Sequence, residues 1–291
     1  MVALMQPGHR SNAKLSLAIP QTATATERCQ PAIQVSNLSI VFDTHHGQLI
    51  AVDRVSFDVP HGEFVCIVGP SGCGKSTVLN TIAGLEEPFE GEILVEGLPV
   101  HRPRPDVGMV FQQPHLFPWK SVRRNIAHGP RMLGKSAQQA NAIADDLIAI
   151  VGLKRFADAF PNTLSGGMQQ RVAIARALAN QPRVLLMDEP FGALDAQTRA
   201  VMQDNLLELR NRIKATIVFV THDIDEAIVL ADRVLIMSAG PGRILRQLNV
   251  ELPRPRSNAI LLEPAYLALK KDCLDVIRAE GLRAFRQSDE A

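Results

Sequence analysis

The stretch Gly69-Pro70-Ser71-Gly72-Cys73-Gly74-Lys75-Ser76-Thr77 decides the fold of this 291-residue chain. The apolar run Phe64–Val68 precedes it and has the composition of a buried strand, and the apolar spacing of Val78–Ala83 after it predicts a helix. Glycines let backbone N–H groups curl around an anion, and a helix N-terminus adds partial positive charge. The order of strand, loop and helix therefore favours a nucleoside triphosphate site over a plain glycine-rich turn. Lys75 is expected to reach the β- and γ-phosphates and Ser76 to bind Mg²⁺.

The overall composition excludes several other classes of protein. The chain has 31 basic and 30 acidic residues, so its net charge of +1 does not indicate nucleic acid or an anionic membrane as a partner. Its cysteines lack CxxC spacing and are interpreted as free thiols in a reducing compartment; they are Cys29, Cys66, Cys73 and Cys273. No apolar run approaches the roughly 18 residues of a membrane span, and the apolar piece 15–20 is too short for a signal-peptide core. A cytoplasmic location is expected.

The N-terminal part of the chain divides into a tail and a set of strands. Residues 1–30 lack periodicity and are interpreted as a flexible tail. Three short alternating runs then predict half-exposed antiparallel strands; they are Ile33–Val35, Leu38–Phe42 and Val55–Val59. Glu92–Gly97 predicts a further strand pair with a turn. Phe42 could stack on an adenine ring or pack in the core, and its spacing does not decide between the two.

A proline-containing loop and a helical insert follow. Val107–Gln112 predicts a strand that ends in a glutamine, and the loop 113–119 after it holds the only tryptophan of the chain. Its apolar residues suggest a docking surface, with a satellite cluster under the next helix as the alternative; they are Leu116, Phe117 and Trp119. From Ser121 to about Arg155 the pattern is helical, with one apolar face made by Ile143, Leu147, Ile150 and Val151.

The sequence contains a second potential anion site and a pair of carboxylates. Ser165 can cap a helix whose first residues, Gly166 and Gly167, leave backbone N–H groups bare. Val184–Glu189 predicts a buried strand that ends in two carboxylates. In a phosphate-loop protein, such an aspartate lies near the metal, and Glu189 beside it could act as a general base on water.

The C-terminal third alternates helices and strands. A helix is expected over about Ala196–Ile213, a strand over Thr216–Thr221 with His222 at its end, and a further strand over Arg233–Met237. A histidine in that position is more often structural, but the carboxyl edge of a parallel sheet is where ligands bind. A last helix, with Tyr266, Leu269, Cys273 and Ile277 on one face, is expected to pack on the core or to contact a partner.

Taken together, these motifs resemble the ATP-binding subunit of an ABC transporter over about residues 33–255. The Walker A loop 69–77, the Q-loop Gln112, the signature 164–171, the Walker B pair Asp188-Glu189, the D-loop 192–195 and the switch His222 occur in family order. One small departure is Phe42, where many relatives carry a tyrosine.

The resemblance implies a nucleotide sandwich of two copies paired head to tail. The Walker A loop of one copy and Ser165-Gly166-Gly167 of the other would hold one ATP, which explains two anion sites in one chain. In this interpretation Lys75, Ser71 and Gly74 hold phosphates, and Mg²⁺ lies among Ser76, Asp188 and Gln112. Glu189 polarises the water, His222 holds the γ-phosphate, and Asp195 links the two sites. ATP binding closes the dimer and hydrolysis reopens it.

The resemblance also implies an architecture, partners and a location. The expected fold is α/β: a P-loop NTPase core with a mostly parallel sheet, an antiparallel β subdomain and an α-helical subdomain at about 115–165. The ATPase domain is expected over 31–255, with a helical extension over 256–291. Phe117-Pro118-Trp119, Thr221-His222-Asp223 and Ser238–Arg243 look like the nitrate, sulfonate and taurine importers. Those systems combine a homodimeric ATPase at the cytoplasmic face of the membrane with permease subunits and a solute-binding protein.

Three other interpretations compete with this one. A soluble ABC ATPase of DNA repair or translation is disfavoured, because the stretch between Thr77 and Ser165 has no heptad array, the chain holds one ATPase unit, and its net charge is near zero. A phosphate-loop kinase or small GTPase leaves the signature and His222 unexplained. A scaffold that binds ATP without hydrolysing it is disfavoured by Glu189.

Overall fold

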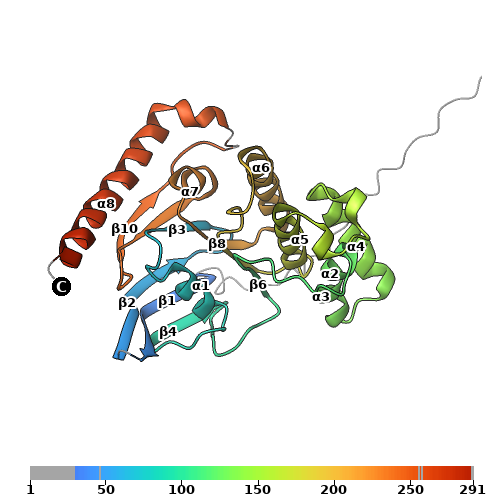
Figure 1. Cartoon of the computed structure of the whole chain (residues 1–291), viewed down its shortest axis with the longest axis horizontal. Helices are drawn as coiled ribbons and strands as arrows, with labels where there is room; N and C mark the ends of the chain where they lie inside the picture. The colour runs from blue at the N-terminus through green and yellow to red at the C-terminus, as the bar shows by residue number, and fades with distance from the viewer. Residues whose placement is uncertain (1–29, 46, 255, 257, 290–291) are drawn as a thin grey trace, which may run out of the picture. The chain divides into compact units, whose positions relative to one another are not determined.

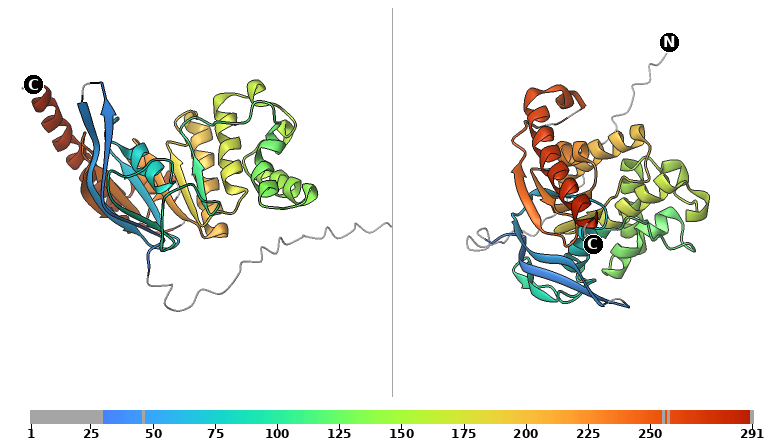
Figure 2. Two further views of the ribbon diagram at one scale, coloured as in Figure 1. Left: turned by 90° about the horizontal axis from the view of Figure 1, so that it is seen from below. Right: turned by 60° about the vertical axis from the view of Figure 1, so that its left-hand side comes forward.

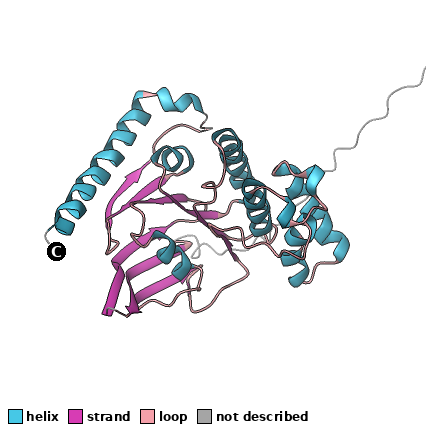
Figure 3. Cartoon of the chain, viewed as in Figure 1, coloured by secondary structure: helices cyan, strands magenta, loops and turns pink. Residues whose placement is uncertain are grey.

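The structure is a computed structural model that describes residues 30–45, 47–254, 256 and 258–289 (Figures 1 and 3). The tail predicted over 1–30, apart from Gln30, and Cys29 lie outside these residues. The strands are β1 Ile33–Thr44, β2 Gly47–Val59, β3 Phe64–Val68, β4 Glu90–Val95, β5 Leu98–Pro99, β6 Val107–Val110, β7 Val184–Asp188, β8 Thr216–Thr221, β9 Arg233–Met237 and β10 Ile244–Asn249. The α-helices are α1 Lys75–Ile82, α2 Val122–Ile126, α3 His128–Met132, α4 Ala137–Ile150, α5 Gly166–Leu178, α6 Ala196–Ile213, α7 Ile224–Leu230 and α8 Pro264–Asp289. Short 3₁₀ turns lie at η2 Lys154–Phe156, η3 Pro161–Thr163 and η4 Asn258–Leu262.

A six-stranded sheet in the order β10-β9-β3-β8-β7-β6 forms the centre of the described chain. The strands from β9 to β6 pair in parallel, and β10 joins β9 antiparallel. Parallel strands have helices on both faces, which explains why β3, β7 and β8 are apolar along most of their length and fully buried. Their carboxyl ends share one edge, where the loop after β3, the Asp188-Glu189 pair and His222 emerge.

The antiparallel sheet has the order β2-β1-β4-β5 and differs in one detail from the expectation. The runs Ile33–Val35 and Leu38–Phe42 were expected as separate strands, but they belong to the single strand β1. Asn37, between them, has a left-handed φ of 49°, and the pairing with β2 and β4 shifts register there. A bulge interrupts the apolar alternation without ending the strand, so the pattern looked like two strands.

The two sides of the central sheet belong to two hydrophobic cores. Val65 and Ile67 of β3 point to the core shared with α1 and the antiparallel sheet. Phe64, Cys66 and Val68 point the other way, to the core that includes the helices α2, α4, α5, α6, α7 and α8. Helix α1 is therefore enclosed between the two sheets (Figure 2), and the loop that precedes it is held by a buried strand on one side and a buried helix on the other.

The predicted helices are present, with some differences at their ends. Helix α1 begins at Lys75, before the apolar run that revealed it, and β6 ends at Val110, before Gln112. The amphipathic face predicted in the insert is confirmed, because Leu147 and Val151 are buried and Ile143 and Ile150 pack beside them. The boundaries of the predicted subdomains remain predictions.

The C-terminal helix α8 packs on the core, which is one of the two alternatives that the sequence left open for it. Tyr266 and Cys273 are each 1% exposed, and Leu269 and Ile277 pack against the same core. In Figure 1 the helix runs alongside β10 and α7, which it contacts. Among the described residues, no helix combines the length and the apolar character needed to cross a membrane.

Candidate nucleotide-binding site

The loop 69–74 ends in a glycine that no other residue could replace without strain. Gly74 has φ 90°, and a Cβ there would lie 2.7 Å from Val52 Cγ2 and 2.9 Å from the carbonyl oxygen of Ala51. It occupies the N-cap position of α1, where no side chain caps the helix. The first N–H groups of the helix are therefore free to bind an anion that approaches the exposed face made by Ser71 and Gly72.

Lys75 lies along this loop and is only 5% exposed. Its Nζ donates hydrogen bonds to the carbonyl oxygens of Gly69 (2.9 Å) and Pro70 (2.8 Å) and lies 3.8 Å from Cys73 Sγ. The ammonium group therefore sits within the loop that would surround a phosphate chain, where little solvent screens its charge.

Ser76 and Asp188 bring two hard oxygen ligands together across 112 residues of sequence. The Ser76 hydroxyl donates to Asp188 Oδ1 at 2.9 Å, and Asp188 is 7% exposed. Burial, together with the negative charge of Glu189, raises the pKa of Asp188 despite the opposing effects of Ser76 and Lys75. A pair made of an exposed hydroxyl and a buried carboxylate suits Mg²⁺, whose ligands are oxygens and whose charge favours the ionised carboxylate.

Two further predicted residues, Gln112 and His222, lie next to Glu189. Its carboxylate accepts a hydrogen bond from Gln112 Nε2 (3.4 Å) and lies 3.2 Å from His222 Nδ1. The Glu189 backbone has a left-handed φ of 43°, which is unusual for a residue with a side chain. Its N–H donates to the carbonyl oxygen of Val220, so β8 holds the strained residue in place. The ends of β6, β7 and β8 thus bring together an amide, a carboxylate and an imidazole.

The start of α5 forms a separate region. Ser165 caps the helix by accepting a hydrogen bond from the Met168 N–H (3.3 Å), as predicted. A Cβ on Gly167 would lie 2.9 Å from Leu194 Cδ2, so the glycine permits close packing against the segment before α6. Within the described chain, the hydrogen bonds of Ser165 stay inside the start of α5 and do not reach the loop 69–74.

Three other predicted site residues make contacts within the fold; they are Asp195, Cys73 and Phe42. Asp195 caps α6, accepting from the Thr198 N–H (2.9 Å) and its hydroxyl (2.7 Å), and the Thr198 amide lowers the pKa of Asp195. Cys73 is fully buried, and its Sγ lies 3.8 Å from Lys75 Nζ. Phe42 is half-buried against the core shared with α1, which leaves part of its ring accessible. The two alternatives for Phe42 are therefore compatible.

Several contacts that support the site were not found from the sequence. Buried Gln170 of α5 donates to the carbonyl oxygen of Phe111 (3.1 Å), next to Gln112. Arg176 donates to the carbonyl oxygens of His115 (2.7 Å) and Pro114 (3.0 Å). Helix α5 thus holds the loop 113–119. These pairs are about 60 residues apart in sequence, and no local pattern marks them.

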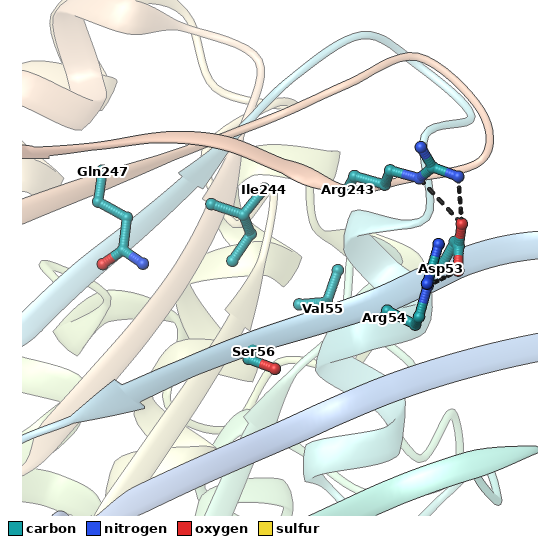
Figure 4. Close-up of a pocket in the computed structure, with 7 residues that line it drawn as sticks. All are labelled: Asp53, Arg54, Val55, Ser56, Arg243, Ile244 and Gln247. Atoms are coloured by element: carbon teal, nitrogen blue, oxygen red, sulfur yellow. Dashed lines mark hydrogen bonds and ion pairs between the residues drawn. The ribbon is translucent and has the colours of Figure 1, made fainter.

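A surface pocket near the turn 240–243 contains none of the predicted site residues (Figure 4). It is lined by Asp53, Arg54, Val55, Ser56, Arg243, Ile244 and Gln247. Arg243 Nε donates to Asp53 at 2.9 Å, and this contact lowers the pKa of Asp53. The turn also joins β2 through hydrogen bonds between Gly242 and both Ala51 and Asp53. A Cβ on Gly242 would lie 2.1 Å from the Cys73 carbonyl oxygen, so the turn packs directly against the backbone of the phosphate loop.

Glu226 is a buried carboxyl group close to His222 in sequence, and no motif marks it. It is 6% exposed and accepts a hydrogen bond from Gln203 Nε2 (3.1 Å). Burial, aided by the charge of Asp223, raises the pKa of Glu226 above its ordinary value. Because an acidic residue in a helix is usually solvated, the local pattern does not reveal its burial.

Glu226→Gln is expected to increase the free energy of unfolding at pH 8 and to lose that gain as the pH falls. A carboxyl group whose folded-state pKa is raised destabilises the protein once the pH exceeds that pKa, by about 1.4 kcal/mol for each pH unit that separates the folded and unfolded pKa values. Below the ordinary value of 4.5 both states are protonated and the difference vanishes. Urea unfolding between pH 5 and 8 measures this, with the exposed Glu87→Gln as the control for a lost charge. A difference that does not change with pH would contradict the prediction.

A buried strand, a glycine loop, an uncapped helix start and a neighbouring strand-end carboxylate define a phosphate-loop nucleotide-binding protein. The ABC transporter family model matches residues 52–192. An ATP-binding protein of Brucella abortus (strain 2308) is 50% identical over 241 residues, which cover 83% of this chain and 91% of that protein. The chain therefore belongs to the ABC transporter family.

Further relatives carry names that include their substrates. The nitrate import ATP-binding protein of Synechocystis is 43% identical over 252 residues, covering 84% of this chain and 95% of that protein. The aliphatic sulfonates import ATP-binding protein of Bacillus cereus is 45% identical, covering 86% and 97%.

A solved ATP-binding cassette, a dimer in a post-hydrolysis state bound to ADP and Pi, matches with a TM-score of 0.70 and 33% identity, over 76% of this chain and all of that one. These findings confirm the predicted fold class and the predicted ATPase activity.

Proposed function

We propose that this chain is the ATP-hydrolysing subunit of an importer and that its nucleotide site is assembled as the sequence predicts. The observation that carries the proposal is the convergence of Ser76, Asp188, Gln112, Glu189 and His222 at one edge of the sheet. Each of these residue types suits one requirement of phosphoryl transfer to water: metal ligation, positioning of the nucleophile and stabilisation of the γ-phosphate. No other described part of the chain collects the same set.

In this proposal the loop binds the triphosphate and the surrounding side chains act on water. Ser71, Gly74 and Lys75, with the backbone of the rest of the loop 69–77, hold the phosphates. Ser76, Asp188 and Gln112 hold Mg²⁺, which supplies neutralisation of the phosphate charge. Glu189 accepts a proton from the attacking water. His222, whose Nδ1 lies 3.2 Å from the Glu189 carboxylate, binds the γ-phosphate.

A second copy is needed to complete the site. Ser165, Gly166 and Gly167 do not contact the loop of their own chain, and the start of α5 offers bare N–H groups. A head-to-tail dimer would place this helix start against the nucleotide of the partner. The solved dimeric cassette bound to ADP and Pi supports this arrangement. Asp195, next to Leu194 and the signature, would lie at the link between the two sites.

The loop 113–119 is the proposed contact with a permease. Trp119 is 69% exposed, whereas Phe117, 5.6 Å from it between ring centroids, is half-buried. Arg176 ties this loop to α5, so motion at the signature would reach it. The relatives named for nitrate and sulfonate import support a small anion, such as nitrate, taurine or an alkanesulfonate, as the transported solute. The chain would then lie at the cytoplasmic face of the membrane, with a solute-binding protein as an indirect partner.

Trp119→Ala is expected to release the chain from membranes that contain its permease. Removing a central exposed aromatic residue weakens an interface by about 2 kcal/mol or more, roughly 30-fold. Co-sedimentation with permease proteoliposomes measures this, with Leu262→Ala, 84% exposed on another segment, as the matched control. ATP affinity of the isolated variant verifies that its nucleotide site is intact.

The same proteoliposomes test coupling to transport. Solute-binding protein loaded with nitrate, taurine or an alkanesulfonate is expected to stimulate ATP hydrolysis, and unloaded protein is not. If the wild-type chain does not bind permease membranes, and hydrolyses ATP equally without them, the transport proposal is wrong. A soluble ABC ATPase would then be the correct interpretation.

A further inference from the structure

The short helix α7 begins two residues after His222 and cannot hold its own position. It has seven residues, Ile224–Leu230, and an isolated helix of that length is unstable in water. Its N-cap is Asp223, which accepts from the N–H groups of Asp225 and Glu226. The placement of α7, and of the His222 loop that enters it, is therefore decided by the segments packed around it.

The N-terminal end of α7 is held by the C-terminal helix α8. Asp225 accepts a hydrogen bond from the Tyr266 hydroxyl, and Lys270 Nζ lies 2.7 Å from Asp225 Oδ1 and 2.9 Å from Oδ2. Tyr266 is the only tyrosine in the chain and is 1% exposed. A hydrogen bond from a buried hydroxyl to one carboxylate fixes the orientation of α7 relative to α8, which apolar packing alone would not specify.

The C-terminal end of α7 is held by the segment that leads to α8. Arg256 is 4% exposed and donates to the carbonyl oxygens at the end of the helix, those of Ile228 (3.0 Å), Val229 (3.4 Å) and Ala231. Arg254 donates to the Leu230 carbonyl oxygen at 3.1 Å. These cations satisfy carbonyl groups that a helix end leaves without partners.

We propose that four residues form a clamp on α7 that positions His222 for ATP hydrolysis; they are Arg254, Arg256, Tyr266 and Lys270. Asp225, Tyr266 and Lys270 are then positioning residues, since they act through α7 and do not contact the nucleotide. The inference rests on the proposed role of His222 and assigns a role to the C-terminal extension. Lys270 and Asp225 are 36% and 47% exposed, so their ion pair adds little stability. Its contribution is to fix where α7 begins.

A second set of contacts keeps α7 folded when the clamp is loosened. From α6, Arg199 lies 3.5 Å from Asp223 and Gln203 donates to Glu226. The apolar face of α7 is buried in the core as well. Loosening the N-terminal end of the clamp is therefore expected to shift the His222 loop without unfolding the helix.

The test is the double variant Tyr266→Phe/Lys270→Met in the full chain, which keeps the apolar volume and removes both contacts to Asp225. The expected result is a kcat for ATP hydrolysis about ten- to a hundredfold lower with KM for ATP unchanged, because misplacement of a group that acts on the transition state affects kcat. Hydrogen exchange of the amides 222–226 is expected to be faster, while that of β3 stays as in the wild type.

Two further variants separate positioning from a general effect on α8. Lys271→Met removes a neighbouring exposed charge and is expected to match the wild type, and Lys270→Arg, which keeps the ion pair, is expected to retain kcat. The clamp is contradicted if the double variant hydrolyses ATP at the wild-type kcat, or if Lys271→Met loses as much activity. A wild-type chain that does not hydrolyse ATP in the same assay would overturn the proposed function, and this inference with it.

Discussion

Glu189→Gln is expected to lower kcat for ATP hydrolysis by about 10²- to 10⁴-fold while ATP binding is retained. Glutamine keeps the size of the side chain and its hydrogen-bonding oxygen, but it cannot accept a proton from water. The position is strained at φ 43° and lies 3.2 Å from His222, so the carboxylate is held where a γ-phosphate and its water would meet. A steady-state assay with saturating ATP measures the effect.

The controls for this variant separate charge from chemistry. Glu92→Gln removes an exposed carboxylate from β4 and is expected to keep the wild-type kcat. ATP affinity of Glu189→Gln is measured independently, because a loss confined to KM would indicate a binding role. Hydrolysis by Glu189→Gln within tenfold of the wild type would show that Glu189 is not the general base.

Lys75→Ala is expected to weaken ATP binding by about 2–5 kcal/mol, or roughly 30- to 5,000-fold in Kd. Lys75 is 5% exposed and its ammonium group is held by the carbonyl oxygens of Gly69 and Pro70, so its charge acts on the phosphates with little screening. Titration calorimetry measures Kd for ATP and for AMP. Because Lys75 is proposed to contact the β- and γ-phosphates, the loss for ATP is expected to exceed that for AMP.

This variant also removes two hydrogen bonds from the loop, and thermal unfolding measures how much stability is lost. Equal losses of ATP and AMP affinity, accompanied by a large drop in Tm, would indicate that Lys75 only supports the loop. Lys154→Ala, on a surface turn far along the chain, is the matched control for loss of a lysine.

The sequence was sufficient to predict an element where its local pattern and its residue chemistry indicate the same structure. The strand Phe64–Val68, the strand through Asp188 and the helix Ala196–Ile213 match their predicted positions, since buried parallel strands are continuously apolar and amphipathic helices have a clear period. The phosphate loop and the strand-end carboxylates were identifiable because their residue types have few other uses in that order. The roles assigned to them remain predictions.

The sequence was insufficient where contacts join distant segments. Strand β1 looked like two strands, because the Asn37 bulge is set by pairing with β2 and β4. The hydrogen bond from Gln170 to Phe111 and that from Tyr266 to Asp225 depend on how whole helices pack. No periodicity encodes such pairs. These are also the contacts that link the site to the loop 113–119 and to the C-terminal extension.

The central proposal is that ATP joins two copies of the chain. Ser165, Gly166 and Gly167 of one copy then complete the nucleotide site of the other copy. The most direct test is the molar mass of purified Glu189→Gln, measured by light scattering with Mg-ATP and with Mg-ADP. A dimer with ATP and a monomer with ADP are predicted, and adding Ser165→Arg to the same chain is predicted to abolish the dimer while ATP still binds. A Glu189→Gln chain that binds ATP but stays monomeric would contradict the proposed dimer.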